Sequence, residues 1–258
     1  MRKAMTGMLL TIGAAMLASC AVSPPVSREQ GAVVPAAQRL MARFWELEVD
    51  PAQLDAFRAL GVENQEASTR LEPGVLMMHA VQFADAPTRV RVLEVYASQS
   101  AYEAHIRTPH FRKYKTASAQ MVRTQKLVPI NPILLCAKGG TIAPADADGL
   151  MVRIAVISVD PAQLAPYKAF LREEQEASVR LEPGVLMLHS VQYAEDPTQV
   201  RLLEVYASRG AYQSHIRTPH FLKYKTGTEK MVTALELPLA NPILLAAKAK
   251  QVGGSTCM

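Results

Sequence analysis

Hydrophobic and polar residues first alternate over residues 42–49, where the chain reads A-R-F-W-E-L-E-V, and this period of two predicts a β-strand. Asp50-Pro51 follows, a pair typical of a helix start, with Asp as N-cap and Pro at the first helical position. One face at helical spacing then continues to Leu71. Glu72-Pro73-Gly74 is expected to end this helix.

Two further strands are predicted at residues 75–83 and 90–97, joined by a hairpin loop. A short helix follows, and then a second helix that begins at Pro109 and runs to about Val122. The last strand, residues 125–135, contains two prolines and is therefore expected at a sheet edge. This order, β-α-β-β-α-β, predicts a ferredoxin-like α+β domain.

The whole pattern occurs twice without a gap. Residues 101–115 read A-Y-E-A-H-I-R-T-P-H-F-R-K-Y-K, and residues 211–225 read A-Y-Q-S-H-I-R-T-P-H-F-L-K-Y-K, an offset of 110 positions. Each copy has the length of a small domain rather than of a solenoid unit. A four-stranded sheet with helices on one face leaves its other face bare, so we expect the two sheets to pack face to face as an intramolecular pseudo-dimer.

Length and composition agree with two domains, because 258 residues of which 49% are hydrophobic suffice for two cores. We expect a signal peptide at 1–19, a tether at 20–40, domains at 41–138 and 150–248, a linker at 139–149 and a tail at 249–258. The net charge of +5 is spread through both copies without a basic block, which argues against nucleic-acid binding.

The first twenty residues predict export. Arg2 and Lys3 precede an apolar run too short to span a bilayer comfortably, and Leu17-Ala18-Ser19-Cys20 resembles a bacterial lipobox. We expect lipidation of Cys20 and location in the cell envelope, at the periplasmic face of the outer membrane; the alternative is an ordinary signal peptide with an incidental cysteine.

The two other cysteines do not favour a disulfide. Cys136 lies in the predicted last strand and is replaced by Ala246 in the second copy, whereas Cys257 lies in a Gly-Ser-Thr tail. There is no C-x-x-C or metal-ligand spacing, and we expect neither a metal nor a cofactor.

Three motifs carry a family resemblance: E-P-G-V-L at 72–76, L-E-V-Y at 93–96 and H-I-R-T-P-H-F at 105–111, each present in both copies. In this order and spacing the chain resembles the antibiotic biosynthesis monooxygenase domain, over about 42–138 and 153–248. It looks most like the small bacterial quinol monooxygenases, and it is also similar to the autoinducer-degrading isomerases of that superfamily.

The resemblance implies a dimeric α/β barrel built from two ferredoxin-like domains. It also implies a reaction without metal or flavin, in which a deprotonated quinol-like or phenolic ring passes an electron to dioxygen inside a dry pocket. The oxygenases of this family often use a tryptophan near the pocket. The only tryptophan here is Trp45, and the second copy departs from the pattern with Ala155.

Polar residues on the predicted strands and helices supply the candidate chemistry. A histidine on an apolar strand face either satisfies the core or faces a cavity, and a carboxylate there is costly unless it is paired or hydrated. A histidine in the first turn of a helix is expected to stay neutral, although it could equally be a cap. The candidates are His79, Glu94, Tyr96, His105 and His110, with His189, Glu204, Tyr206, His215 and His220 in the second copy.

We interpret the chain as a cofactor-independent monooxygenase of a small quinol-like or phenolic compound, with dioxygen as co-substrate. His105 or His79 would be the base, Glu94 its orienting partner and Tyr96 a donor to the ring oxygen. Asn64 is replaced by Glu174, so the two sites are not equivalent. The alternatives are a non-catalytic lipoprotein that binds a hydrophobic ligand, or isomerase or haem-degrading chemistry on the same fold.

Overall fold

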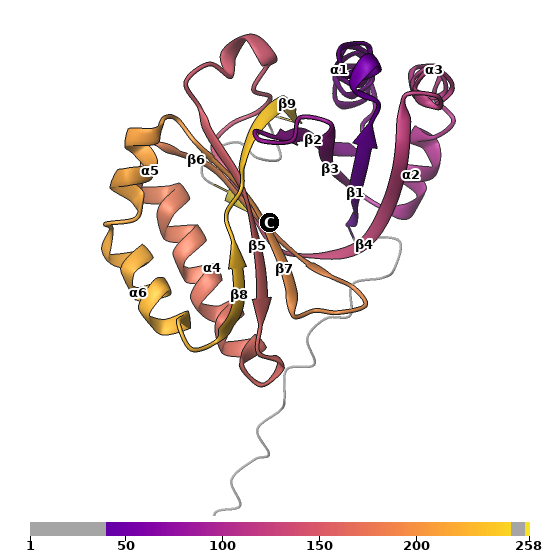
Figure 1. Cartoon of the computed structure of the whole chain (residues 1–258). Helices are drawn as coiled ribbons and strands as arrows, with labels where there is room; N and C mark the ends of the chain where they lie inside the picture. Colours follow the sequence, from indigo (N-terminus) through magenta and orange to yellow (C-terminus); the bar gives the residue numbers. More distant parts are fainter. Residues whose placement is uncertain (1–39, 249–255) are drawn as a thin grey trace, which may run out of the picture. The chain divides into compact units, whose positions relative to one another are not determined.

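The computed structural model describes residues 40–248 and 256–258, and both repeats belong to one compact unit (Figure 1). The predicted signal peptide, Cys20 and almost all of the tether lie outside the described residues. Within the described part of the chain, no helix is long and apolar enough to cross a membrane.

The first repeat has the predicted order of elements. It contains β1 (Met41–Val49), α1 (Leu54–Leu71), β2 (Val75–Phe83), β3 (Arg89–Tyr96), α2 (Gln99–His105), α3 (Pro109–Ser118) and β4 (Val122–Ala137). The helix starts are capped as expected, because Asp50 accepts a hydrogen bond from the amide of Ala52 and opens a 3₁₀ turn before α1. Helix α3 ends earlier than predicted, since Val122 already pairs with Val49 in the β-ladder.

The second repeat copies the first with one interruption. It contains β5 (Met151–Val159), α4 (Leu164–Leu181), β6 (Val185–Tyr193), β7 (Gln199–Tyr206), α5 (Arg209–His215), α6 (Pro219–Thr228), β8 (Val232–Glu236) and β9 (Leu239–Ala247). Strands β8 and β9 together correspond to β4. They are separated at Pro238, where the first repeat has Val128, because proline has no N–H to donate to the ladder.

The two sheets face each other and are also joined edge to edge. The strand order is β1-β3-β2-β9-β5-β7-β6-β4, and β4 pairs with β1 again, so the ladder closes on itself. The interior is filled by apolar side chains from both repeats, among them Phe44, Met77, Ile154 and Met187. The predicted α+β fold, with two ferredoxin-like units forming a dimeric α/β barrel within one chain, is confirmed.

The closure depends on the last strand of each repeat. The first half of β4 pairs with β1 of its own repeat, from Arg43 opposite Pro129, and its second half pairs with β6, from Ile130 opposite Tyr193. Strand β9 pairs with β2 in the same way. From Val122 to Leu134 this strand has a ladder partner on one side only, so the edge position expected from its prolines is confirmed, although the strand serves two sheets in turn. Its proline Pro132 is tolerated because the ladder shifts register there, between Pro132 and Leu134.

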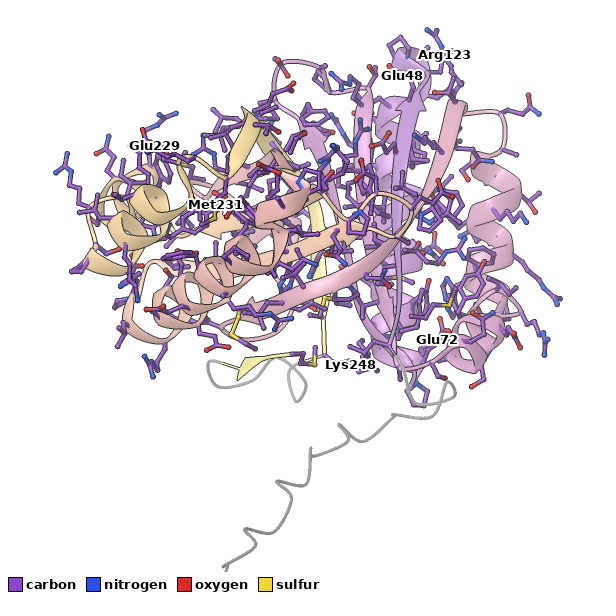
Figure 2. All side chains as sticks on the ribbon, turned by 90° about the horizontal axis from the view of Figure 1, so that it is seen from below. Glu48, Glu72, Arg123, Glu229, Met231 and Lys248 are labelled. Atoms are coloured by element: carbon purple, nitrogen blue, oxygen red, sulfur yellow. A yellow bond between two sulfur atoms is a disulfide. The ribbon has the colours of Figure 1, made fainter. Side chains whose placement is uncertain are left out.

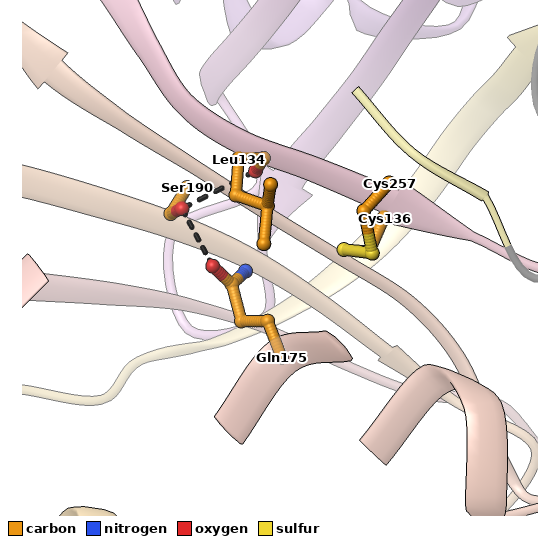
Figure 3. The surroundings of a disulfide bond; sticks show 5 residues. All are labelled: Leu134, Cys136, Gln175, Ser190 and Cys257. Atoms are coloured by element: carbon orange, nitrogen blue, oxygen red, sulfur yellow. Dashed lines mark hydrogen bonds between the residues drawn. A yellow bond between two sulfur atoms is a disulfide. The ribbon is translucent and has the colours of Figure 1, made fainter. Parts of the chain in front are cut away.

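The end of the chain is fastened to this crossing strand. Cys136 and Cys257 form a disulfide (Figure 3), and the short strand β10 (Thr256–Cys257) pairs with Ala137 and Cys136 of β4. The sequence-based expectation of no disulfide is wrong, because the tail folds back beside β4.

The end of β9 also contacts the first repeat. Figure 2 labels Lys248 just after β9 and Glu72 just after α1, and the Lys248 ammonium donates a hydrogen bond to the carbonyl of Thr69, 2.7 Å away.

Candidate active site

A cavity of about 500 Å³ lies between the helices and the sheet of the first repeat. Its walls come from α1, from β1–β3 and from α2 and α3, and its lining is largely aromatic and aliphatic: Trp45, Phe57, Met78, Val92, Tyr96, Tyr102, Phe111 and Tyr114. Ile243 of β9 also lines it, so the second repeat contributes one wall. Such a mostly apolar cavity with a few polar groups is the usual form of a small-molecule site.

The carboxylate of Glu94 lines this cavity and is held by donors from two strands. Its Oε2 accepts hydrogen bonds from Trp45 Nε1 at 3.2 Å and from the Tyr96 hydroxyl at 3.1 Å, and Arg43 Nε lies 3.7 Å away. Burial raises the pKa of Glu94 above its ordinary value, against the opposing effects of these donors and cations. The arrangement therefore places a proton acceptor of increased basicity at an apolar wall.

Arg43 and Tyr96 complete this polar end of the cavity. The guanidinium of Arg43 lies over the ring of Tyr102, 4.2 Å from its centroid, and over Trp45 at 5.1 Å. Burial, together with the neighbouring charge of Glu94, raises the pKa of Tyr96, so its hydroxyl stays protonated as a donor. Both Glu94 and Tyr96 were predicted as site residues, and the structure brings them together in the cavity.

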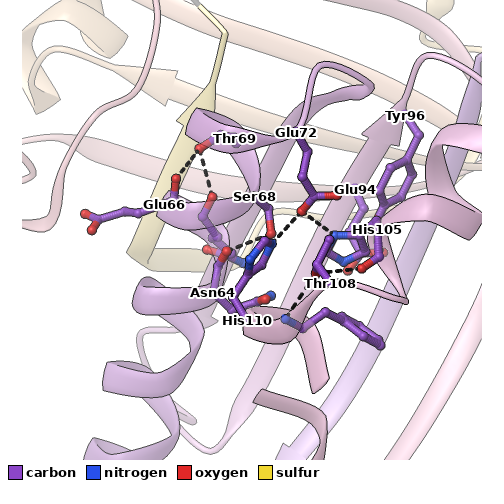
Figure 4. Close-up of polar contacts among 12 residues, drawn as sticks. Asn64, Glu66, Ser68, Thr69, Glu72, Glu94, Tyr96, His105, Thr108 and His110 are labelled. Carbon is purple, nitrogen blue, oxygen red and sulfur yellow. Dashed lines mark hydrogen bonds and ion pairs between the residues drawn. The ribbon is translucent and has the colours of Figure 1, made fainter. Parts of the chain in front are cut away.

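His105 and His110 meet at a third residue, Glu72 (Figure 4). One carboxylate oxygen of Glu72 is 2.9 Å from His105 Nδ1 and 2.6 Å from His110 Nε2. Burial alone would raise the pKa of Glu72, but the hydrogen bonds from the two histidines hold it below its usual value. Glu72 was interpreted only as a helix stop. Its presence in both repeats at a fixed distance before both histidines was the available signal.

The second repeat has the same arrangement, with Glu182 Oε1 at 2.9 Å from His215 Nδ1 and 2.6 Å from His220 Nε2. The predicted pairing of Glu94 with a histidine is therefore not the one that the structure holds: Glu72, and not Glu94, is the carboxylate that orients His105. Neither His105 nor His110 is among the residues that line the cavity.

His79 and His189 lie apart from the cavity, in the barrel interior. Their rings stack with centroids 5.3 Å apart, and none of their four ring nitrogens has a hydrogen-bond partner among the described residues. Burial lowers the pKa of both rings, to about 4 for His189. The pair therefore fits neither alternative fully, because the rings make no core hydrogen bond to the described residues and face only a small void.

The corresponding space of the second repeat is filled. A Cβ on Gly61 of α1 would meet open space, whereas Leu171, at the same position of α4, is completely buried. The hydroxyls of Tyr167 and Tyr224 bond to each other at 3.0 Å where the first repeat has Phe57 and Tyr114. Glu204 and Tyr206 keep their mutual hydrogen bond, at 3.0 Å. Because Ala155 replaces Trp45, Glu204 has no indole donor from that position.

Comparisons with known proteins agree with this architecture. The sequence profile of the antibiotic biosynthesis monooxygenase family matches residues 41–117 and 150–227, and the chain belongs to this family. No curated protein sequence matches the chain significantly.

Among solved structures, a protein of Lactobacillus acidophilus assigned as a monooxygenase aligns with a TM-score of 0.77 at 20% identity, over 85% of this chain and 99% of its own. A similarly assigned protein of Fusobacterium nucleatum aligns with a TM-score of 0.73 at 18% identity, over 84% and 97%. A protein of Bacteroides thetaiotaomicron assigned to antibiotic biosynthesis monooxygenases is 52% identical over 40% of this chain and 97% of its own, with a TM-score of 0.38. The first two matches show that the tandem fold recurs in single proteins, and membership of the family supports a monooxygenase.

Proposed function

We propose that the chain is a cofactor-independent monooxygenase of a quinol-like or phenolic small molecule, and that its first repeat holds the active site. The observation that carries the proposal is the carboxylate of Glu94, which is only 16% exposed, lines an aromatic cavity and is held there by Trp45 and Tyr96. Family membership supports the reaction class.

In this proposal Glu94 removes the proton of the ring hydroxyl. Burial raises its basicity, and Arg43 stabilises the phenolate that forms. The electron-rich ring reduces dioxygen directly, so that one quinol and one O₂ yield one hydroxyquinone and one water. We assign the base to Glu94 rather than to His105 or His79, because Glu94 alone of these three lines the cavity.

The test is oxygen uptake with a menadiol-type quinol. Glu94→Gln keeps the shape of the side chain and removes the base, and we expect a loss of at least about 100-fold in kcat/KM. Glu204→Gln is the matched control in the second repeat, where we expect wild-type rates. Equal rates in both variants, or no quinol-dependent oxygen uptake by the wild type, would refute the assignment.

The same cavity is the basis of the second candidate, a protein that holds a hydrophobic ligand without turnover. Its aromatic lining and its volume of about 500 Å³ suit a bicyclic or tricyclic ring system. Native mass spectrometry of the purified chain distinguishes the two, since an unaltered stoichiometric ligand together with no oxygen uptake would favour binding.

We also propose that the chain is lipid-anchored through Cys20 at the periplasmic face of the outer membrane. The charged, apolar and lipobox-like segments of the first twenty residues support this, and so does the disulfide between Cys136 and Cys257, because disulfides persist in oxidising compartments. The expected result is that Cys20→Ser abolishes incorporation of labelled fatty acid. Unchanged labelling would contradict the anchor.

A further inference from the structure

We propose that Glu72, His105 and His110, and likewise Glu182, His215 and His220, each bind a divalent transition-metal ion of the zinc class. The two sets are called the Glu-His-His clusters below. The sequence suggested no such site, because Glu72 is 33 residues from the nearer histidine. The fold brings the end of α1 against the junction of α2 and α3.

The donor set suits such an ion. In each cluster the three ligand atoms lie within 4.8 Å of one another. Two imidazoles and one carboxylate form a known zinc donor set, with a fourth position left for water. Ligands around a tetrahedral Zn²⁺ stand about 3.3 Å apart. The present separations of 2.6 and 2.9 Å therefore require the glutamate to move back by about half an ångström.

The other nitrogen of the buried histidine is the second argument. In the first repeat, a neutral His105 that donates from Nδ1 to Glu72 leaves Nε2 without a proton, and that atom is buried with no partner among the described residues. A metal ion on Nδ1 moves the proton to Nε2, which then needs an acceptor. Such outer acceptors orient most metal-bound histidines.

Each repeat carries a side chain with an acceptor oxygen at the same position of its long helix. In the second repeat Glu174 Oε1 lies 3.6 Å from His215 Nε2. In the first repeat the same helical position is Asn64, whose Oδ1 is also buried without a partner among the described residues. In the metal-bound tautomer His105 Nε2 would carry a proton, and Asn64 Oδ1 would be available to accept it in a hydrogen bond.

The retention of both clusters separates them from the chemistry of the cavity. The second repeat has no counterpart of Trp45 or of the open space at Gly61, yet its cluster has the same 2.6 and 2.9 Å separations. A group that served only the cavity would have no reason to persist there. The clusters are also within reach of solvent, because the side chains of Glu72 and His110 are 11% and 16% exposed.

The experiment uses the full chain, purified without a histidine tag and stripped with a chelator. It is titrated with Zn²⁺, and with Co²⁺ as a spectroscopic probe. We expect two equivalents per chain, the visible absorption of four-coordinate Co²⁺, and a higher Tm with metal. His110→Gln and His220→Gln should each remove one equivalent, and the double variant both.

The exposed carboxylate of Glu63, whose ion-pair partner among the described residues is Lys113, provides the control: Glu63→Gln should keep both equivalents. Circular dichroism checks the fold of each variant. The proposal is overturned if the wild type takes up less than half an equivalent at about 10 μM free Zn²⁺, or if the double variant, still folded, binds as the wild type does. These readouts are independent of quinol oxidation.

Discussion

The two repeats have the same backbone fold, contribute to one barrel and each carry a Glu-His-His cluster. They differ in the space between helices and sheet. In the first repeat that space is a cavity, with Gly61 on one side and Trp45 on the other. In the second it is core, where Leu171 is fully buried and Ala155 stands in place of the indole. The same fold therefore encloses a cavity in one half and packed core in the other, because a few side-chain volumes differ.

The largest expected effect follows from transferring one residue between the repeats. Gly61→Leu places in α1 the residue that fills α4, and quinol-dependent oxygen uptake should fall by about 1,000-fold or more, since the substrate no longer fits. The fold should not suffer, because a Cβ at this position meets nothing within 4 Å and leucine favours a helix over glycine.

Gly61→Ala is the matched control, for which we expect most of the activity and a small gain in stability, up to about 1 kcal/mol. If Gly61→Leu retained full activity with an unchanged KM, the cavity would not be the site of the reaction.

The reverse experiment tests the packed half. Leu171→Ala removes a fully buried side chain and should lower the free energy of unfolding by about 3–4 kcal/mol, because it leaves a void where the first repeat has a cavity. Urea denaturation measures this. Leu181→Ala, at a side chain that is 60% exposed, should change it by less than about 0.5 kcal/mol. Comparable losses in both variants would mean that α4 is not packed as described.

A third prediction concerns the feature that both repeats share equally, the stacked pair His79 and His189. Unfolded, His189 takes up a proton near pH 6.5; folded and buried, it does so only at about pH 4. The unfolded state therefore binds more protons between these values. The free energy of unfolding should fall by about 3 kcal/mol as the pH drops from 6.5 to 4.

The small void beside the pair is also lined by Arg91 and Arg201. Urea denaturation at several pH values measures the slope. In His189→Leu the free energy of unfolding should change less between pH 6.5 and 4 than in the wild type. An unchanged slope would show that the ring is not held neutral.

The smallest expected effect concerns the indole that only the first repeat possesses. Trp45→Phe keeps an aromatic wall but removes the hydrogen bond to Glu94, so kcat/KM should fall by about tenfold, which corresponds to one hydrogen bond to a charged group. Oxygen uptake measures it. Ala155→Ser, at the matching position of the second repeat, should leave the rate unchanged, and a larger loss there would move the site to the other half.

Much of the fold could be predicted from the sequence, because local periodicity and the repetition of whole motifs are visible in one chain. The strand 42–49, the cap at Asp50 and the doubling of the unit are all of this kind. What could not be predicted depended on distant pairing. The exchange of β4 and β9 between the repeats, and the return of Cys257 to Cys136, join segments whose local sequence carries no sign of the partner.

The candidate site divides in the same way. Glu94 and Tyr96 were found because a carboxylate between apolar strand neighbours is conspicuous, and His105 and His110 because they stand in a repeated motif. Glu72 was missed because a glutamate before Pro-Gly has a sufficient local explanation. Leu171 is buried, whereas the equivalent position Gly61 borders open space. This difference could be judged only from the volumes of all their neighbours.

The crossing of β4 and β9 also determines whether one repeat can exist without the other. The second half of β4 and the outer edge of β2 both pair with strands of the other repeat, so a fragment ending near residue 138 would carry unpaired strand edges and tend to pair with a second copy of itself. The second repeat is thus a structural requirement of the first, because it supplies the strands that pair with these edges. Shared strand pairing thus holds two repeats together whose interiors are packed differently.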